Sequence, residues 1–262
     1  DLKTQQPSDD ELAQLFLDEG VCQIKSSLTR AQALLCQETV EHRFQACLNT
    51  IRMLDLRQQF ARGFDTFKLR DKGRYDMVLP EFSSDGVDER FDFLRDGAPW
   101  LPLVCKILNS DTPKLVHTGV MHSLPGSSIQ PWHSDGPHLN KNFERNHLPP
   151  HAVNVFVPLT DLTLKKGPTE FVAGSHRNWH TSSVPMVIAA QCGDAVLFDY
   201  RLKHRGLNNA SNEPRPLLYF TYAINDWKDH ANFSKTRYLK FPELIEPQTR
   251  EERNSIRGVG SK

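Results

Sequence analysis

The chain has 262 residues, which is long enough for one large domain or two small ones with a substantial buried core. It carries 32 basic and 32 acidic residues, so its charge gives no indication of binding to nucleic acid or to a membrane surface. No apolar run approaches the roughly 18 to 20 residues that cross a bilayer. We therefore expect a globular protein with no membrane span and no nucleic-acid partner.

The cysteines are scattered, odd in number and without any C-x-x-C pair. They are Cys22, Cys36, Cys47, Cys105 and Cys192. This usage argues against a disulfide framework or a structural zinc site and favours a reducing compartment. The first residue is Asp1 and not methionine, which leaves room for a targeting segment ahead of it. Localisation thus stays open, with an intracellular protein as the expectation, and a monomer is the simplest assumption for the oligomeric state.

The first third of the chain, residues 1–112, is predicted to be a mostly helical cap that includes a substrate loop. The segment from Ser8 to Glu11 matches a capping box, and Gly20 follows the apolar stripe of the helix that would begin there. The run VCQI at 21–24 is consistent with a short strand. Apolar residues at helical spacing then predict a second, longer helix over 28–54.

Residues 62–98 are charged and interrupted by glycines, so we expect irregular backbone there. They include FKLRDKGRYDMVLPEF at 67–82, where four basic residues precede a tyrosine. One interpretation is a solvated, charged loop. The other is a substrate loop in which Arg70 or Arg74 recognises an anionic group.

The character of the chain changes at Lys114. Short β-branched or aromatic runs alternate with Pro, Gly, Asn and Asp, a pattern typical of an antiparallel sandwich or jelly roll. We predict a jelly-roll core over 113–225 and a C-terminal extension over 226–262, within one domain of residues 1–262. The fold class is thus mainly β with a helical N-terminal cap.

One short stretch of this β region, QPWHSDGPH at 130–138, contains two potential metal ligands, His133 and Asp135. His204 lies 71 residues after His133, and Arg215 lies 11 residues after His204. Of the eleven histidines, only His133 has Asp two residues later, and only His204 has Arg eleven residues later. These four residues are our candidate site.

The chemistry of an iron centre explains this set. Two imidazoles and one carboxylate can occupy one face of an iron octahedron and leave three positions open. A spacing of two in an extended segment directs His133 and Asp135 to the same side. The open positions accept dioxygen and a bidentate 2-oxo acid. If that acid has a second carboxylate, a guanidinium fork such as Arg215 holds it better than a lysine does.

At these residues the chain resembles the phytanoyl-CoA dioxygenase-like (PhyH) family of Fe(II)- and 2-oxoglutarate-dependent oxygenases. The matching pieces are QPWHSDGPH, VFVPLTD…KKGPTEFVAGSH, CGDAVLFDYRLKHRGLNN and RPLLYFTYA, in the family's order. The resemblance implies a double-stranded β-helix core, which is a jelly roll of the cupin-like kind. It implies Fe(II) bound by His133, Asp135 and His204, with 2-oxoglutarate held by Arg215. Asp135 is intact, so the resemblance does not extend to the halogenating relatives, which replace that carboxylate.

Other candidate residues surround this set. Asn154 interrupts an apolar strand and either touches the co-substrate or has a structural partner. Trp132 and His138 flank the ligands and could form a pocket wall. The strand over 115–124 should line the barrel with alternate residues, and the sequence leaves two sets open. One set is His117, Gly119, Met121 and Ser123, and the other is Thr118, Val120 and His122.

We therefore predict a dioxygenase that uses Fe(II), 2-oxoglutarate and O2 to oxidise a C–H bond of a small, anionic organic metabolite, with release of succinate and CO2. The outcome is hydroxylation, desaturation or oxidative cyclisation. The alternative is a catalytically silent jelly-roll module that binds a metal or a ligand. A zinc hydrolase would need no clamp for a second carboxylate, so Arg215 argues against it. Phytanoyl-CoA itself is not inherited from the family name, because one fold hosts many substrates.

Overall fold

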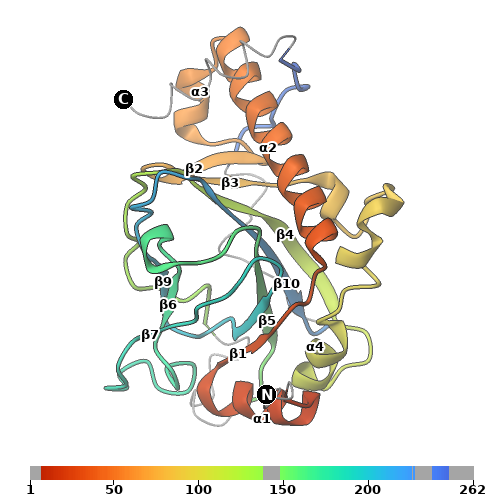
Figure 1. Ribbon diagram of the computed structural model, residues 1–262, viewed down its shortest axis with the longest axis vertical. Coiled ribbons are helices and arrows are strands. Elements are labelled where there is room, and N and C mark those ends of the chain that lie inside the picture. Colours follow the sequence, from red (N-terminus) through yellow and green to blue (C-terminus); the bar gives the residue numbers. More distant parts are fainter. Residues whose placement is uncertain (1–6, 138–147, 226, 228–237, 248–262) are drawn as a thin grey trace.

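The computed structural model describes residues 7–137, 148–225, 227 and 238–247. Two antiparallel sheets face each other, with helices covering the larger one (Figure 1). The helices are α1 (Asp9–Glu19), α2 (Arg30–Met53), α3 (Arg57–Arg62) and α4 (Leu101–Leu108). The 3-10 turns are η1 (Pro80–Phe82), η2 (Glu89–Leu94) and η4 (Leu164–Lys166). The strands are β1 (Val21–Ile24), β2 (Phe67–Asp71), β3 (Arg74–Met77), β4 (Lys114–Ser123), β5 (Ala152–Pro158), β6 (Thr169–Phe171), β7 (Met186–Val187), β8 (Ala195–Asp199), β9 (His204–Gly206) and β10 (Arg215–Ala223).

The major sheet has seven strands in the order β1-β8-β5-β10-β4-β3-β2, and the minor sheet has three in the order β7-β6-β9. Aromatic contacts join the two sheets: the ring of Phe171 on β6 lies 5.3 Å from that of Phe198 on β8. Two facing antiparallel sheets with N-terminal helices are the predicted arrangement, so the predicted fold class is confirmed. Within the described residues, no helix is both long enough and apolar enough to cross a membrane.

The predicted N-terminal helices form as the sequence indicates. The Ser8 hydroxyl accepts from the backbone of Glu11, whose carboxylate accepts in return from the Ser8 N–H, and α1 ends at Gly20 in the left-handed conformation. Helix α2 begins with a second capping box at Thr29. Several of its buried residues, including Val40 and Phe44, belong to the main hydrophobic core together with β-sheet residues.

Successive side chains of the major sheet point to opposite faces, which settles the open question on β4. Val120 belongs to the core that includes the helices, as do Val155, Leu218 and Phe220. The β4 residues of the other set are paired with β10. Ser123, Met121, Gly119 and His117 lie opposite Arg215, Leu217, Tyr219 and Thr221, respectively. Directly paired residues share a face of the sheet, so His117, Gly119, Met121 and Ser123 face the interior between the sheets.

The expectation of irregular backbone over 62–98 is wrong for part of this range. Strands β2 and β3 form a hairpin, and β3 pairs with β4, so that the hairpin extends the major sheet. Gly73 lies in the turn with φ +66°, which few residues other than glycine adopt readily. The first third of the chain is therefore not only a helical cap, because it contributes three of the seven strands of the major sheet.

The described part of the C-terminal extension packs against this hairpin and against α2. The Phe241 ring lies 4.9 Å from that of Phe64 and 6.0 Å from that of Phe67. The backbone of Ile245 accepts from the Asn49 amide and donates to the Thr50 hydroxyl, both at 2.8 Å. These contacts attach the extension to the side of α2.

Candidate metal centre and co-substrate site

The three predicted metal ligands come together in space. His133 and His204 exchange two backbone hydrogen bonds, of 3.1 and 2.8 Å, and the Asp135 N–H donates to the carbonyl of Tyr200 at 3.1 Å. These bonds fix the ligand segment against β9. The candidate ligand atoms of His133, Asp135 and His204 all lie within 4.8 Å of one another. In the described part of the chain, no other group of three His, Cys, Asp or Glu residues meets this criterion.

The backbone also orients both histidine rings. Nδ1 of His133 lies 2.9 Å from the carbonyl oxygen of Pro131, and Nδ1 of His204 lies 2.9 Å from that of Leu202. A ring that donates from Nδ1 keeps the lone pair on Nε2 for a metal. Burial lowers the pKa of His204, which favours the neutral imidazole that binds metals.

Asn154 holds the carboxylate of the third ligand. Its amide Nδ2 donates to Oδ2 of Asp135 at 2.5 Å, and its Oδ1 accepts from the Thr221 hydroxyl at 2.6 Å. Thr221 therefore fixes which way the amide points, and the amide fixes one carboxylate oxygen. The prediction that Asn154 contacts the co-substrate stays a prediction, and the structure adds this contact with Asp135.

The donor set fits a divalent ion of the iron group. It offers two neutral imidazole nitrogens and one carboxylate, which together suit Fe(II) with open positions. The Asp135 side chain is 29% exposed and that of His204 only 5%, so the cluster is open on one side. His204 Nε2 lies 3.9 Å from Asp135 Oδ2, which leaves room for an ion between the ligands.

Arg215 opens β10 on the same interior face as Thr221 and is 1% exposed. Its Nη1 donates to the carbonyl of Gly167, and its Nη2 donates to the Ser123 hydroxyl at 2.9 Å. Its Nε is buried and has no hydrogen-bond partner among the described residues. Burial, reinforced by the nearby charge of Arg74, lowers the pKa of Arg215 to about 9. A buried cation with an unsatisfied N–H fits the carboxylate of a 2-oxo diacid.

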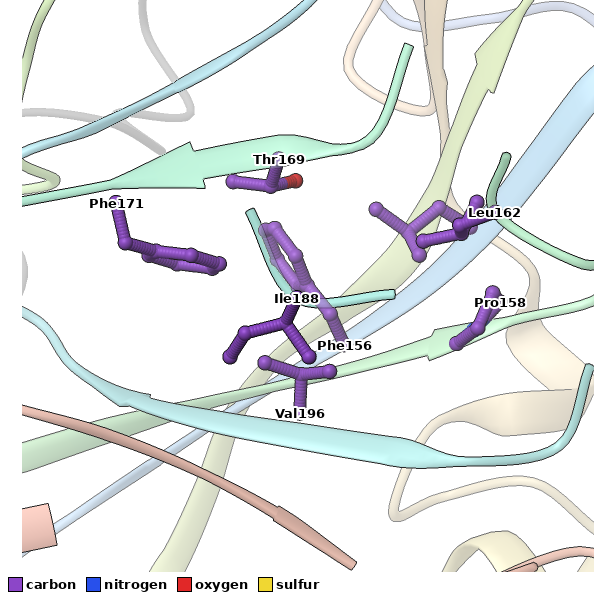
Figure 2. A pocket seen from close by; sticks show the side chains of 8 residues that line it. Phe156, Pro158, Leu162, Thr169, Phe171, Ile188 and Val196 are labelled. Atoms are coloured by element: carbon purple, nitrogen blue, oxygen red, sulfur yellow. The ribbon is translucent and has the colours of Figure 1, made fainter. Parts of the chain in front are cut away.

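A small apolar pocket lies between the two sheets, lined in part by residues near Arg215 and near His204. Side chains from both sheets converge on it, and the Thr169 hydroxyl is the one polar group among the labelled side chains (Figure 2). Leu217, which lines it, is two residues from Arg215 on the same face of β10. Phe171, another lining residue, has its ring 6.1 Å from that of His204. These side chains form an apolar boundary beside the site.

The hairpin residues predicted for the substrate lie in different surroundings. Arg74 is 1% exposed and donates to Ser123, so it is a neighbour of Arg215 and not part of an exposed loop. Arg70 is 30% exposed and donates from Nε and Nη2 to Asp76 Oδ2 at 2.8 and 2.7 Å. Asp76 also accepts from the Tyr219 hydroxyl at 2.8 Å. The sequence analysis overlooked Asp76 and Tyr219, which take part in this polar cluster.

The Trp132 ring packs against two basic side chains. It lies 4.2 Å from the guanidinium carbon of Arg205, and Lys203 lies 5.8 Å from the same ring. Lys203 and Arg205 are the chain neighbours of His204. The pocket wall expected at Trp132 stays a prediction. His138 lies outside the described residues.

The fold and this cluster define a class: jelly-roll proteins with a metal centre of two histidines and one carboxylate. The family described as phytanoyl-CoA dioxygenase (PhyH) matches residues 40–217, and the chain belongs to this family. The resemblance seen in the sequence is thereby confirmed.

Curated relatives carry names that agree with this family. Dioxygenase hkm4 of Aspergillus hancockii is 37% identical over 99 residues, which are 36% of this chain and 32% of the relative. The Fe(II)/2-oxoglutarate-dependent dioxygenase nvfF of Aspergillus novofumigatus is 34% identical over 98 residues, 36% of this chain and 33% of the relative. The iron/alpha-ketoglutarate-dependent dioxygenase penM of Penicillium thymicola is 24% identical over 195 residues, 72% of this chain and 54% of the relative. The chain thus matches about a third of the length of hkm4 and nvfF and about half of penM.

Solved structures share the fold at low sequence identity. HygX of Streptomyces hygroscopicus, with nickel and 2-oxoglutarate bound, has a TM-score of 0.61 at 14% identity and covers 90% of this chain and 96% of its own. The epimerase SnoN, in complex with Fe3+, alpha ketoglutarate and nogalamycin RO, has a TM-score of 0.59 at 14% identity, with 93% and 96% coverage. AviO1 of Streptomyces viridochromogenes has a TM-score of 0.56 at 18% identity, with 86% and 99% coverage. At these low sequence identities, the similarity to the solved structures shows only a shared fold.

Proposed function

We propose that the protein is an Fe(II)- and 2-oxoglutarate-dependent dioxygenase that oxidises a C–H bond of a small organic metabolite and releases succinate and CO2. The observation that carries the proposal is the pairing, in one interior, of the His133, Asp135 and His204 cluster with a buried arginine whose Nε lacks a partner. A metal site alone would suit a hydrolase or a silent module. The arginine is what a second carboxylate requires.

Each residue has a defined part in this proposal. His133, Asp135 and His204 would hold Fe(II), which supplies the activation of O2 and of the 2-oxo acid when bound. Arg215 would bind the distal carboxylate of 2-oxoglutarate and thereby fix the position of the 2-oxo acid end. Asn154 keeps one Asp135 oxygen engaged, and the apolar side chains of Leu217 and Phe171 lie close to Arg215 and His204, respectively.

The substrate that we propose carries an anionic group, and Arg70 is the residue that would bind it. Lys68 and Arg70 lie beside the same acid, Asp76, at 3.5 and 2.7 Å, and the Arg70 side chain is 30% exposed, so its guanidinium is accessible to a ligand. Asp76 pairs with Met121 across β3 and β4, and Met121 faces the interior. The cluster thus lies on the same face of the sheet as Arg215. Hydroxylation is the proposed outcome, and product analysis separates it from desaturation and ring closure.

The experiment measures succinate release from 2-oxoglutarate after anaerobic reconstitution with Fe(II) and admission of O2. His204→Ala should reduce iron-dependent succinate formation by at least about tenfold to a hundredfold, the loss seen even when groups around the ligands are removed. His42, an exposed histidine beside Glu246, provides the control His42→Ala, which should retain full turnover. Turnover of His204→Ala equal to wild type would contradict the proposal. Metal binding by the wild type without succinate release with any substrate would favour the silent module.

The substrate proposal is tested with a panel of carboxylates, acyl-CoAs, amino-acid derivatives and neutral terpenoids. Arg70→Gln should raise the KM for an accepted anionic substrate and leave uncoupled 2-oxoglutarate turnover in place. Stimulation of succinate release by neutral compounds alone would overturn the anionic substrate but not the dioxygenase.

A further inference from the structure

Arg74, Ser123 and Arg215 form one row across three neighbouring strands. Ser123 on β4 pairs with Arg74 on β3 and with Arg215 on β10, so all three side chains leave the same face of the sheet. Both guanidiniums donate to the one Ser123 hydroxyl, Arg74 from 3.0 Å and Arg215 from 2.9 Å. Each of the three residues is at most 1% exposed. Two positive charges are therefore buried side by side with a serine between them.

No carboxylate of the described residues forms an ion pair with either arginine. The remaining bonds of Arg74 run to the carbonyl oxygens of Ser128 and Leu207, at 2.9 and 3.1 Å. The Nε of Arg74, like that of Arg215, is buried without a hydrogen-bond partner in the described structure. By contrast, the equally buried Arg201 is paired with Asp199 at 2.6 Å. Among the described residues, the two arginines of the row thus lack the carboxylate partner that Arg201 has.

Arg74 also reaches the strand that carries a metal ligand. It donates to the carbonyl of Leu207, which follows His204 by three residues. A Cβ atom on Gly206 would lie 2.8 Å from Arg74 Nη1. Only a residue without a side chain leaves the guanidinium room at this point. Arg74 therefore connects the major sheet to the C-terminal end of β9, the strand that begins at His204.

We infer that Arg74 is a second arginine of the co-substrate site, which together with Arg215 makes the protein select a 2-oxo acid with two carboxylates over one with a single carboxylate. The inference rests on the proposed function. Two adjacent buried cations repel each other, and one distal carboxylate neutralises part of that charge. Ser123 keeps both guanidiniums in place. A ligand with no distal carboxylate leaves this repulsion unrelieved.

The test compares the binding of 2-oxoglutarate and of 2-oxopentanoate, which has the same chain length but no distal carboxylate. Binding is measured by calorimetry on Mn(II)-loaded protein without oxygen, so that no turnover is needed. Arg74→Gln should weaken 2-oxoglutarate about tenfold to a hundredfold, the range for a hydrogen bond to a charged group. Binding of 2-oxopentanoate should change by less than about threefold, within the scatter of an uncharged contact. Arg74→Lys, which keeps the charge, should retain the larger share of the preference.

The control variant is Arg95→Gln. Arg95 has a side chain only 9% exposed and, like Arg74, donates to two backbone carbonyls, but it lies by η2. Its loss should lower stability without changing the preference between the two acids. An unchanged 2-oxoglutarate affinity in Arg74→Gln, or an equal loss for both acids, would overturn the inference. If Arg74→Gln does not fold, Arg74→Lys decides, since loss of the preference in a folded lysine variant also overturns it. A wild-type protein that binds neither acid would instead refute the proposed function.

Discussion

Replacing Asn154 by leucine should weaken metal binding although Asn154 is not a ligand. Leucine has nearly the same size but cannot donate to Asp135 Oδ2, to which the amide donates at 2.5 Å. A hydrogen bond to a charged group contributes about 1.5 to 3 kcal/mol. At about 1.4 kcal/mol per tenfold change, metal affinity should fall about tenfold to a hundredfold, if the whole contribution is felt in the metal-bound state. The Thr221 hydroxyl also loses its acceptor, which lowers the free energy of unfolding by about 1 to 3 kcal/mol.

The metal affinity is measured by calorimetric titration of the metal-free protein with Mn(II) or Ni(II). Asn49→Leu is the matched control, because Asn49 is also 3% exposed but binds the backbone of Ile245 instead of a metal ligand. It should lose stability and keep its metal affinity. If Asn154→Leu binds metal as well as the wild type does, or if both variants lose the same affinity, the reasoning about this amide is refuted.

Three further outcomes follow from single residues. Arg215→Lys keeps the charge but not the fork, so the KM for 2-oxoglutarate should rise with metal affinity little changed, and an unchanged KM would place the co-substrate elsewhere. Burial lowers the pKa of His122 to about 4, so the unfolded chain binds this proton at a higher pH than the native one. Stability should therefore fall as the pH falls from 6.5 towards 4, and His122→Phe should reduce the loss between pH 7 and 5 by about 2 kcal/mol, measured by urea unfolding. Burial raises the pKa of Cys22, Cys36 and Cys47 to about 12, so a thiol reagent should modify the exposed Cys192 first and these three only on unfolding.

The candidate metal ligands could be predicted because two of them share a local spacing and the third lies at a distinctive distance from Arg215. His133 and Asp135 share a side by spacing alone, and His204 was linked to them by the position of Arg215 and by the family resemblance. Their backbone partners could not be predicted in the same way. The carbonyls of Pro131 and Leu202 that orient the rings depend on how two distant segments are paired.

The hairpin at 67–77 was missed although its sequence alternates as a strand does. Phe67, Leu69, Tyr75 and Met77 alternate with Lys68, Arg70, Arg74 and Asp76. We assigned the charged residues to solvent or to an exposed loop, whereas three of the four are buried on the interior face. Charges normally mark the outer face of a strand. Here they mark the inner face, where Arg74 and Asp76 pair with Ser123 and Met121 of β4.

The β4 strand could not be oriented for a related reason. Both of its alternate sets mix polar and apolar residues, with His117 and Ser123 in one and Thr118 and His122 in the other. Only the pairing with β10 separates them.

The order of strands in the major sheet also limits how this chain can be divided. Its two outermost strands, β1 and β2, both come from the first third of the chain, and they cover β8 on one side and the β3–β4 pair on the other. In a fragment that keeps only residues 113–225, β8 and β4 would become edge strands with unpaired backbone donors and acceptors. Such edges recruit strands from other molecules and lead to aggregation. The N-terminal third therefore protects the jelly roll from pairing with strands of other molecules. We expect that a cut at residue 112 would give an aggregating fragment and not a minimal catalytic core.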